Sequence, residues 1–266
     1  MTGIGLSRFA DLLMSVTEAD LATDVTLSGR LLLSQSGELT VCYAPFDYIQ
    51  RSARLVIVGI TPGAQQARKA LVEARRQLIA GSDHETALRA AKVFASFSGP
   101  MRANLIAMLD HVGLHRWLGV ASTAEVWNAR TDLVHFTSAL RYPVYLKGEN
   151  YSGSPSMTAT PLLQELLVRC LGEEVEALPH AVWVPLGPKA TEGIVWLVQQ
   201  GFLSPERVLM GLPHPSGANA ERIAYFLGRK ERALLSAKTA PDSIDAARAR
   251  LSAQVAALPA RFAALT

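Results

Sequence analysis

The chain has 266 residues, of which 49% are hydrophobic and 18% are charged, the composition of a globular protein with a sizeable core. It contains no apolar run near the ~20 residues that a membrane-spanning helix needs. Its first twenty residues lack the layout of a secretory signal. We therefore expect a cytoplasmic protein without a membrane partner.

The cysteines and the net charge limit the chemistry further. Cys42 and Cys170 lie far apart and are the chain's two cysteines, which excludes a four-cysteine zinc or iron–sulfur site within one chain and argues against a disulfide framework. We expect two buried, reduced thiols and neither a metal nor a cofactor. The net charge of +3 permits nucleic-acid binding without demanding it.

In chain order, residues 1–53 carry little strand signal except around Leu39–Tyr43, and we expect them to form a cap or an edge addition. Short apolar runs then predict buried strands at Leu55–Val58, Leu133–Phe136, Val182–Pro185 and Val208–Met210. Each run leads into a distinctive loop: GITPG, TSALRYP, LGPKA and GLPHPSGAN.

Helical patterns separate these runs. Capping boxes are predicted at Ser82-x-x-Glu85 and Ser122-x-x-Glu125, and Thr160 followed by Pro161 predicts another helix start. A final amphipathic helix over Asp242–Leu265 places one apolar stripe against the body, formed by Ile244, Leu251, Val255 and Leu258.

Strands that alternate with helices indicate an α/β fold with a mostly parallel sheet covered on both faces. Ligands bind such sheets outside the carboxyl ends of the strands, so we expect the loops to line one pocket. We expect a single domain over 1–266, with the cap at 1–53, the core at 54–230 and the C-terminal helix within 231–266.

The first motif, GITPG, is neither a phosphate-binding G-x-x-x-x-G-K-[ST] loop nor a dinucleotide-binding G-x-G-x-x-G loop. It presents Thr61 at a helix entrance, with Pro62 biasing the Thr61 backbone toward an extended form. Basic residues on the following helix suit either a solvated face or phosphate contacts: Arg68, Lys69, Arg75 and Arg76.

The second motif, PHPSGAN, holds His214 between Pro213 and Pro215, which stiffen the loop. A lone loop histidine is most often structural. Ser216 and the amides after it suit a phosphate oxygen, and a second basic group follows: Arg222, Arg229, Lys230 and Arg232. His111 and His115 stand four residues apart, but Gly113 between them predicts a helix end instead of a metal site.

Together, GITPG after a hydrophobic strand and HPSGAN later in the chain resemble the two active-site motifs of the uracil-DNA glycosylase superfamily. The segments FSGPMRANLIAMLDHVGL, HFTSAL and VPLGPKA resemble intervening family segments in the expected order, so the resemblance covers roughly residues 45 to 230. It implies a three-layer α/β/α sandwich with a central, mostly parallel four-stranded sheet. The two cysteines exclude the iron–sulfur branches of the superfamily.

The resemblance implies a role for each matched residue. His214 would stabilise negative charge on the departing base, as an oxyanion hole does, and Thr61 would position the attacking water. The base would lie among Ile60, Gly63, Phe97 as aromatic platform and Ser138 as reader of the base edge. DNA would be contacted by Ser216, Gly217, Asn219 and Arg222, and the motif geometry would be set by Gly59, Pro62, Pro213 and Pro215.

Departures from the family pattern bear on the substrate. Relatives carry Asp or Asn at the position of Thr61, and a hydroxyl cannot take a proton from water at neutral pH. Gly63 stands where uracil-specific branches carry a bulky Tyr, and Ser138 cannot make the bidentate contact of an Asn. Ala218 replaces the wedge Leu of some branches. These changes favour a larger pocket that is less committed to uracil.

We therefore expect a monomeric, monofunctional DNA glycosylase acting on a flipped-out pyrimidine enlarged at C5, such as the glucosylated hydroxymethylcytosine of phage DNA, in antiviral defence. One alternative is base-excision repair of uracil or a deaminated base. Another is a non-catalytic DNA-binding module that kept the fold. Asp47 is a further candidate to assist the water.

Overall fold

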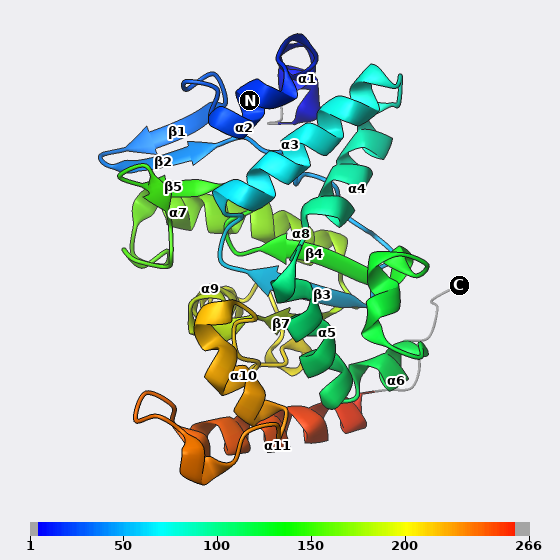
Figure 1. The fold of residues 1–266 in the computed structure, drawn as a ribbon, viewed down its shortest axis with the longest axis vertical. Helices are drawn as coiled ribbons and strands as arrows, with labels where there is room; N and C mark the ends of the chain where they lie inside the picture. Colours follow the sequence, from blue (N-terminus) through cyan, green and yellow to red (C-terminus); the bar gives the residue numbers. More distant parts are fainter. Residues whose placement is uncertain (1–4, 259–266) are drawn as a thin grey trace. The chain divides into compact units, whose positions relative to one another are not determined.

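A computed structural model describes residues 5–258, which divide into two compact units. The first unit comprises the chain up to Ile49, Gly59–Ser98 and Phe136–Ala177, and the second comprises Gln50–Val58, Gly99–His135 and the chain from Leu178 onward. Both units combine helices with strands, so the chain is an α/β protein, as the alternating pattern predicted (Figure 1). None of the helices within residues 5–258 is long and apolar enough to cross a membrane.

A three-stranded sheet has the order β4-β3-β7. Its strands are β3 (Leu55–Gly59), β4 (Val134–Ser138) and β7 (Val182–Pro185), which confirms three of the predicted runs. β3 pairs with β7 in parallel, with Leu55 opposite Val182. All five residues of β3 are buried, which explains its unbroken apolar sequence, because a strand covered on both faces needs no polar alternation.

The run Val208–Met210, predicted as a fourth strand, forms only one parallel bridge, between Val208 and Trp183. The Leu209 amide donates to the Trp183 carbonyl at 2.9 Å, and pairing then stops. Gly211 follows with a φ of +123°, and Pro213 has no N–H to donate, so the backbone cannot continue a ladder.

A second, antiparallel sheet in the first unit has the order β1-β2-β5-β6 and was predicted only at β2. Its strands are β1 (Leu32–Ser36), β2 (Leu39–Cys42), β5 (Val144–Leu146) and β6 (Glu149–Asn150). The strand β2 confirms the signal at Leu39–Tyr43. The strands β1 and β6 are mostly exposed or polar, and β5 is a buried run of only three residues, so none of them carries an apolar run long enough for a sequence pattern to detect.

Helices of the first unit are α1 (Leu6–Ser15), α2 (Glu18–Thr23), α3 (Ala64–Ile79), α4 (His84–Ala95), α7 (Pro161–Leu166), the π-helical turn Leu167–Gly172 and α8 (Glu173–Ala177). Figure 1 shows α3 and α4 side by side. Both bury alanines, including Ala70 of α3 and Ala91 of α4, and such small side chains let the two helices approach closely. Asp83, not the predicted Ser82, caps α4, because its carboxylate accepts the Thr86 N–H.

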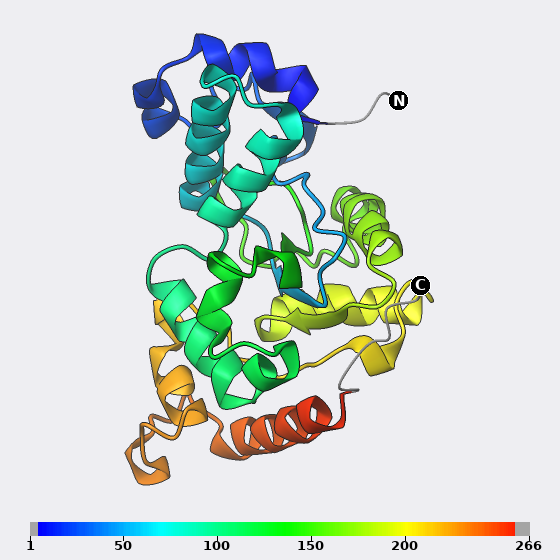
Figure 2. The same ribbon diagram turned by 90° about the vertical axis from the view of Figure 1, so that its right-hand side faces the viewer.

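Helices of the second unit are α5 (Pro100–His111), α6 (Leu114–Leu118), α9 (Gly187–Gln199), α10 (Ala220–Phe226) and α11 (Pro241–Ala257). Figure 2 shows α11 in red, in contact with α10 and α6. Leu251 and Val255 of its predicted stripe are buried. The predicted helix beyond Leu258 lies outside the described residues.

Short 3-10 turns complete the structure, at Thr123–Trp127, Thr131–Leu133, Pro205–Arg207, Gly217–Asn219 and Arg232–Leu234. The first begins with the capping box that the sequence predicted at Ser122 and Glu125. Thr160 and Pro161 begin α7, also as predicted. Cys42 and Cys170 are free and buried, which confirms the expectation for the two thiols.

Candidate functional site

The turn after β3 packs tightly against two predicted site residues of the first unit. A Cβ atom added at Gly59 would lie 3.3 Å from Ser138 Oγ and 3.7 Å from the Phe97 ring. The Ala139 amide donates to the Gly59 carbonyl at 2.8 Å, which holds the turn against the end of β4. A side chain at position 59 would therefore press on Ser138, and Gly59, Phe97 and Ser138 form one contiguous group.

Phe97 has a strained backbone. Its φ is +48°, in the left-handed region that a bulky side chain rarely adopts, at a cost of about 1–3 kcal/mol. The half-buried ring meets Phe136 edge-on, with ring centroids 5.9 Å apart. Strain of this kind persists only where the surrounding structure fixes the residue, and it is concentrated at binding sites. The aromatic platform assigned to Phe97 remains a prediction that this backbone supports.

Thr61 is tied to the segment between β4 and β5. Its hydroxyl donates to the Tyr142 carbonyl at 2.9 Å and accepts the Val144 N–H at 3.1 Å. A hydroxyl has one proton and two acceptor lone pairs, so one lone pair of Thr61 is left to orient a water. Thr61 can therefore accept from a water but has no proton to donate to it.

We expect Thr61→Val to lower the free energy of unfolding by about 1–3 kcal/mol, because it removes the hydrogen bonds that the Thr61 hydroxyl makes with the Tyr142 carbonyl and the Val144 amide. Thr61→Ser keeps the hydroxyl and should stay within about 0.5 kcal/mol of the wild type, apart from the lost methyl group. Urea unfolding of both variants measures the difference. Equal stability of the valine and serine variants would contradict the contact.

Gly63 begins α3, and two amide side chains border it. Gln66 Oε1 accepts the Gly63 N–H at 2.8 Å, and Asn150 Oδ1 accepts the Ala64 N–H at 2.8 Å. A Cβ at Gly63 would lie 3.0 Å from Gln66 Oε1 and 3.6 Å from Asn150 Oδ1. The sequence had singled out neither amide, because Asn150 is 86 residues away and reaches α3 only through the β5–β6 hairpin.

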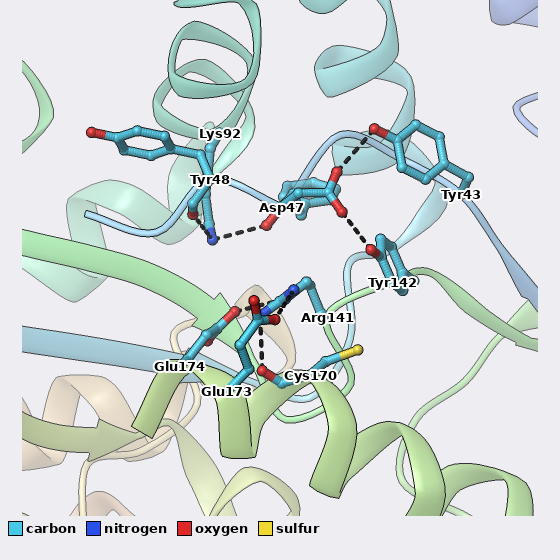
Figure 3. Close-up of polar contacts among 10 residues, drawn as sticks. Tyr43, Asp47, Tyr48, Lys92, Arg141, Tyr142, Cys170, Glu173 and Glu174 are labelled. Atoms are coloured by element: carbon cyan, nitrogen blue, oxygen red, sulfur yellow. Dashed lines mark hydrogen bonds and ion pairs between the residues drawn. The ribbon is translucent and has the colours of Figure 1, made fainter. Parts of the chain in front are cut away.

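Asp47, the carboxylate proposed to assist the water, is hydrogen-bonded by two tyrosines (Figure 3). Tyr43 Oη donates to Asp47 Oδ2 at 2.9 Å, and Tyr142 Oη donates to Asp47 Oδ1. Burial raises the pKa of the Asp47 carboxyl above its ordinary value, and the two hydroxyl donors oppose this shift. Both oxygens are engaged, so the geometry gives Asp47 a supporting role: it holds Tyr142, whose carbonyl holds Thr61.

Lys92 secures the backbone on both sides of Asp47. Its buried ammonium donates to the Phe46 carbonyl at 2.9 Å and to the Tyr48 carbonyl at 2.6 Å. Burial lowers the Lys92 pKa to about 8. Lys92 of α4 therefore holds the backbone on both sides of Asp47 in place, and with it the carboxylate that accepts from Tyr43 and Tyr142.

Arg141 holds the segment that precedes Tyr142 (Figure 3). Its guanidinium donates to Glu174 at 2.8 Å, to Glu173 at 2.9 Å and to the Cys170 carbonyl at 2.8 Å. The side chains of Arg141 and Glu174 are 6% and 0% exposed, so this ion pair is buried. A buried pair is costly to break, because removing one partner leaves the other charge without compensation.

The second motif belongs to the second unit, and its histidine is held from several directions. A Cβ added at Gly187, which has a φ of +76°, would lie 2.9 Å from His214 Cβ, so only glycine fits against the backbone and Cβ of His214. Asn104 Nδ2 donates to the Pro215 carbonyl at 2.9 Å. Neither Asn104 nor Gly187 was predicted as a site residue, because nothing local in the sequence links them to His214.

The hydrogen bonding of His214 defines its tautomer. The Ser216 N–H donates to His214 Nδ1 at 3.3 Å, so Nδ1 carries a lone pair and a neutral ring carries its proton on Nε2. Burial lowers the pKa of His214 below its ordinary value of 6.5. At neutral pH this residue is an uncharged imidazole that can donate one hydrogen bond from Nε2.

This shift has a consequence for stability. Because the folded pKa of His214 lies below 6.5, the unfolded chain binds more protons there as the pH falls through 6.5. The wild type should therefore lose stability relative to His214→Gln between about pH 7 and about pH 5. Urea unfolding of both proteins at several pH values tests this. Parallel stability profiles would show that the pKa is not shifted.

The predicted DNA-contacting side chains of the second motif form one chain of hydrogen bonds. Asn219 Nδ2 donates to Ser216 Oγ at 3.2 Å, and Arg222 donates to Asn219 Oδ1 at 2.9 Å and to the Lys238 carbonyl. The Ser216 hydroxyl keeps its proton for a ligand oxygen. Gly217 begins the exposed 3-10 turn beside it.

The basic clusters are largely engaged within the protein. After the second motif, Lys230 pairs with Glu221 at 2.7 Å, and Arg232 pairs with Asp242 at 2.7 Å. After the first motif, Arg76 pairs with Glu73, and Lys69 donates to Ser98 Oγ. Carboxylates therefore neutralise the charges of Arg76, Lys230 and Arg232, whereas Lys69 is only hydrogen-bonded to a hydroxyl.

No family model matches the chain, and no solved structure matches it. A relative is found in Bacillus subtilis (strain 168), where it bears the name "Uncharacterized protein YoxB". The two are 37% identical over 221 residues, which cover 82% of this chain and 84% of the relative. At this identity and coverage the two proteins share a common ancestor along most of their length. The chain therefore belongs to the same family as YoxB of Bacillus subtilis.

Proposed function

We propose that this protein is a monofunctional DNA glycosylase that releases a pyrimidine enlarged at C5, such as glucosylated hydroxymethylcytosine, in defence against phage. The observation that carries the proposal is the state of His214, a neutral imidazole held between two prolines. Because Nδ1 accepts the Ser216 N–H, the ring proton is on Nε2, from which it can be donated to a ligand. A fixed neutral donor of this kind suits negative charge that develops on a departing base.

The reaction is a hydrolysis of the N-glycosidic bond. The oxygen of water bonds to C1′ of the deoxyribose, and the N1–C1′ bond breaks with its electron pair going to the base. The water loses a proton to solvent, and the base takes one up. His214 Nε2–H would donate to the base oxygen O2 as its charge grows, and the free lone pair of Thr61 would orient the water.

The group around the first motif supports a base site. Phe97 offers a ring fixed by its backbone, and Ser138 Oγ lies beside it against Gly59. Ile60 and Gly63 would complete the contacts, with Pro62 setting the turn. A serine hydroxyl cannot make the bidentate hydrogen bond with the uracil edge that an Asn amide makes. The preference for uracil over other bases would therefore be weaker by about 1–3 kcal/mol.

The proposal extends to the partner and the fold. Ser216, Gly217, Asn219 and Arg222 would contact the DNA backbone, with the nucleotide flipped out of the stack. We also propose that the strands and helices make up the three-layer α/β/α sandwich of the uracil-DNA glycosylases, in a protein that acts as a monomer in the cytoplasm. The resemblance of the two motifs is the support for these points.

A panel of oligonucleotides tests the reaction. Single- and double-stranded DNA carrying one uracil, deaminated purine, 5-hydroxymethylcytosine or glucosylated hydroxymethylcytosine is incubated with the protein and treated with alkali, which cleaves at abasic sites. We expect cleavage to be strongest with the glucosylated base. Cleavage at uracil alone would refute the enlarged base and establish the repair alternative.

A second candidate is a non-catalytic DNA-binding module. It is favoured by Thr61, whose hydroxyl already makes two bonds within the protein and cannot act as a base. It would be established by the absence of base release from every substrate, together with DNA affinity that falls steeply as salt rises.

A further inference from the structure

A polar pocket lies in the first unit, immediately after the first motif. Its volume is about 250 Å³, and it is lined by Thr23, Asp24, Val25, Thr26, Thr40, Ala64, Arg68, Tyr145 and Gly148. Ala64 is the residue that follows Gly63 and begins α3. The volume falls below the ~300–1,000 Å³ of pockets that enclose whole drug-sized ligands, so it suits one small ring and not a nucleotide.

Three polar side chains in this pocket have no hydrogen-bond partner among the described residues. Tyr145 is 5% exposed, and its buried hydroxyl is unsatisfied. Thr40 stands directly opposite Tyr145 across the β2–β5 pair, and within residues 5–258 its half-buried hydroxyl makes no hydrogen bond. Arg68 is exposed and pairs with no carboxylate of the described part of the chain. An unsatisfied buried hydroxyl costs about 1–3 kcal/mol, which a ligand oxygen would recover.

The Tyr145 hydroxyl is near the Asp24 carboxylate, which also lines the pocket. Burial raises the pKa of Tyr145, and the nearby Cys42 thiol and Asp24 carboxylate add to the shift. Asp24 is itself held in place, because Thr26 donates to its Oδ1 from the amide at 2.8 Å and from the hydroxyl at 2.7 Å. The Asp24 carboxylate is therefore held in position by the protein itself.

The charges of the pocket decide what kind of ligand fits. An anion would meet the Asp24 carboxylate, and the first two amides of α3 are already taken by Gln66 and Asn150. A cation would meet Arg68, and the oxygens of Asp24 already accept from Thr26 and Ser28. An apolar group would bury the free hydroxyls without partners. A neutral group with several hydroxyls satisfies Thr40, Tyr145 and Arg68 together.

We propose that this pocket binds a single neutral hexose, and that this hexose is the substituent on C5 of the excised pyrimidine. The second clause rests on the proposed function. The pocket is lined by Ala64, one residue beyond Gly63, which is the position that the resemblance places beside C5 of the base. Tyr145 and Thr40 are specificity-determining residues in this assignment, since they would contact the sugar and not the bond that breaks.

Tyr145→Phe and Thr40→Val test the assignment. Each variant removes one hydroxyl that has no hydrogen-bond partner among residues 5–258, so the fold should keep its stability. On glucosylated hydroxymethylcytosine we expect kcat/KM to fall about five- to ten-fold for each variant, the effect of one lost hydrogen bond. On 5-hydroxymethylcytosine in the same oligonucleotide we expect no change. Tyr48→Phe is the matched control, because Tyr48 belongs to the same unit and does not line the pocket.

Binding of the free sugar separates the two proposals. Saturation-transfer NMR with methyl α-D-glucopyranoside and with methyl β-D-glucopyranoside should detect contact with the wild type and with Tyr48→Phe, and a weaker signal with Tyr145→Phe. If sugar binds but no base is released, the glycosylase proposal fails and the hexose pocket stands. If base is released and neither sugar nor glucosylated DNA distinguishes Tyr145→Phe from the wild type, the hexose pocket is overturned and the glycosylase stands.

Discussion

Replacement of His214 by alanine is expected to lower kcat for base release by about 10²–10³-fold, the effect of removing one donor from an oxyanion hole. Alanine keeps the Cβ atom that packs on Gly187, so the loop should retain its shape. The Nε2 donor, however, is lost, and with it the stabilisation of charge on the departing base. Single-turnover cleavage of the best substrate of the panel measures kcat, and fluorescence anisotropy measures DNA affinity.

The control for this variant is His180→Ala, which removes an exposed histidine of the same unit. It should leave both base release and DNA binding unchanged. If His214→Ala releases base as fast as the wild type, His214 is a structural histidine and the proposed mechanism is wrong. Equal losses of base release and DNA affinity would likewise count against a role confined to the transition state.

The largest expected effect on stability comes from Arg141→Met, which should lower the free energy of unfolding by about 3–5 kcal/mol. The methionine removes the ion pair that Arg141 makes with the buried Glu174 carboxylate and the hydrogen bond that it donates to the Cys170 carbonyl. Removing both charges in Arg141→Met/Glu174→Leu should recover most of the loss, because a buried pair replaced by apolar side chains is often close to neutral. Urea unfolding of the three proteins measures this.

Lys147→Met supplies the comparison. Its ion pair with Glu38 joins side chains that are 67% and 63% exposed, and such pairs contribute about 0–1 kcal/mol. If Arg141→Met costs no more than Lys147→Met, the buried pair does not stabilise the first unit. Arg141→Met should also loosen the first motif. Arg141 directly precedes Tyr142, and the Tyr142 carbonyl accepts the hydrogen bond of the Thr61 hydroxyl.

The sequence located the elements whose signals are local. β3 and β7 were found because strands buried on both faces are continuously apolar, and the starts at Ser122 and Thr160 were found because a cap lies next to the helix that it begins. The same reasoning failed at Val208, where the residues after the apolar run cannot hold a ladder. It also missed β1 and β6, which are mostly exposed or polar, and β5, which is a buried run of only three residues.

The amino-acid sequence by itself therefore predicted the α/β class and the two motif turns, and the roles of His214 and Thr61 remain predictions from the resemblance of those motifs. The tertiary structure decided what each of these residues touches. Asn104 reaches Pro215 across 111 residues, and Tyr142 reaches Asp47 across 95. It also decided that Asp47 supports the first motif through its hydrogen bonds with two tyrosines, and that Tyr145 and Thr40 line one pocket. Contacts between distant segments depend on how strands and helices pack, and a local pattern of residues carries no record of that packing.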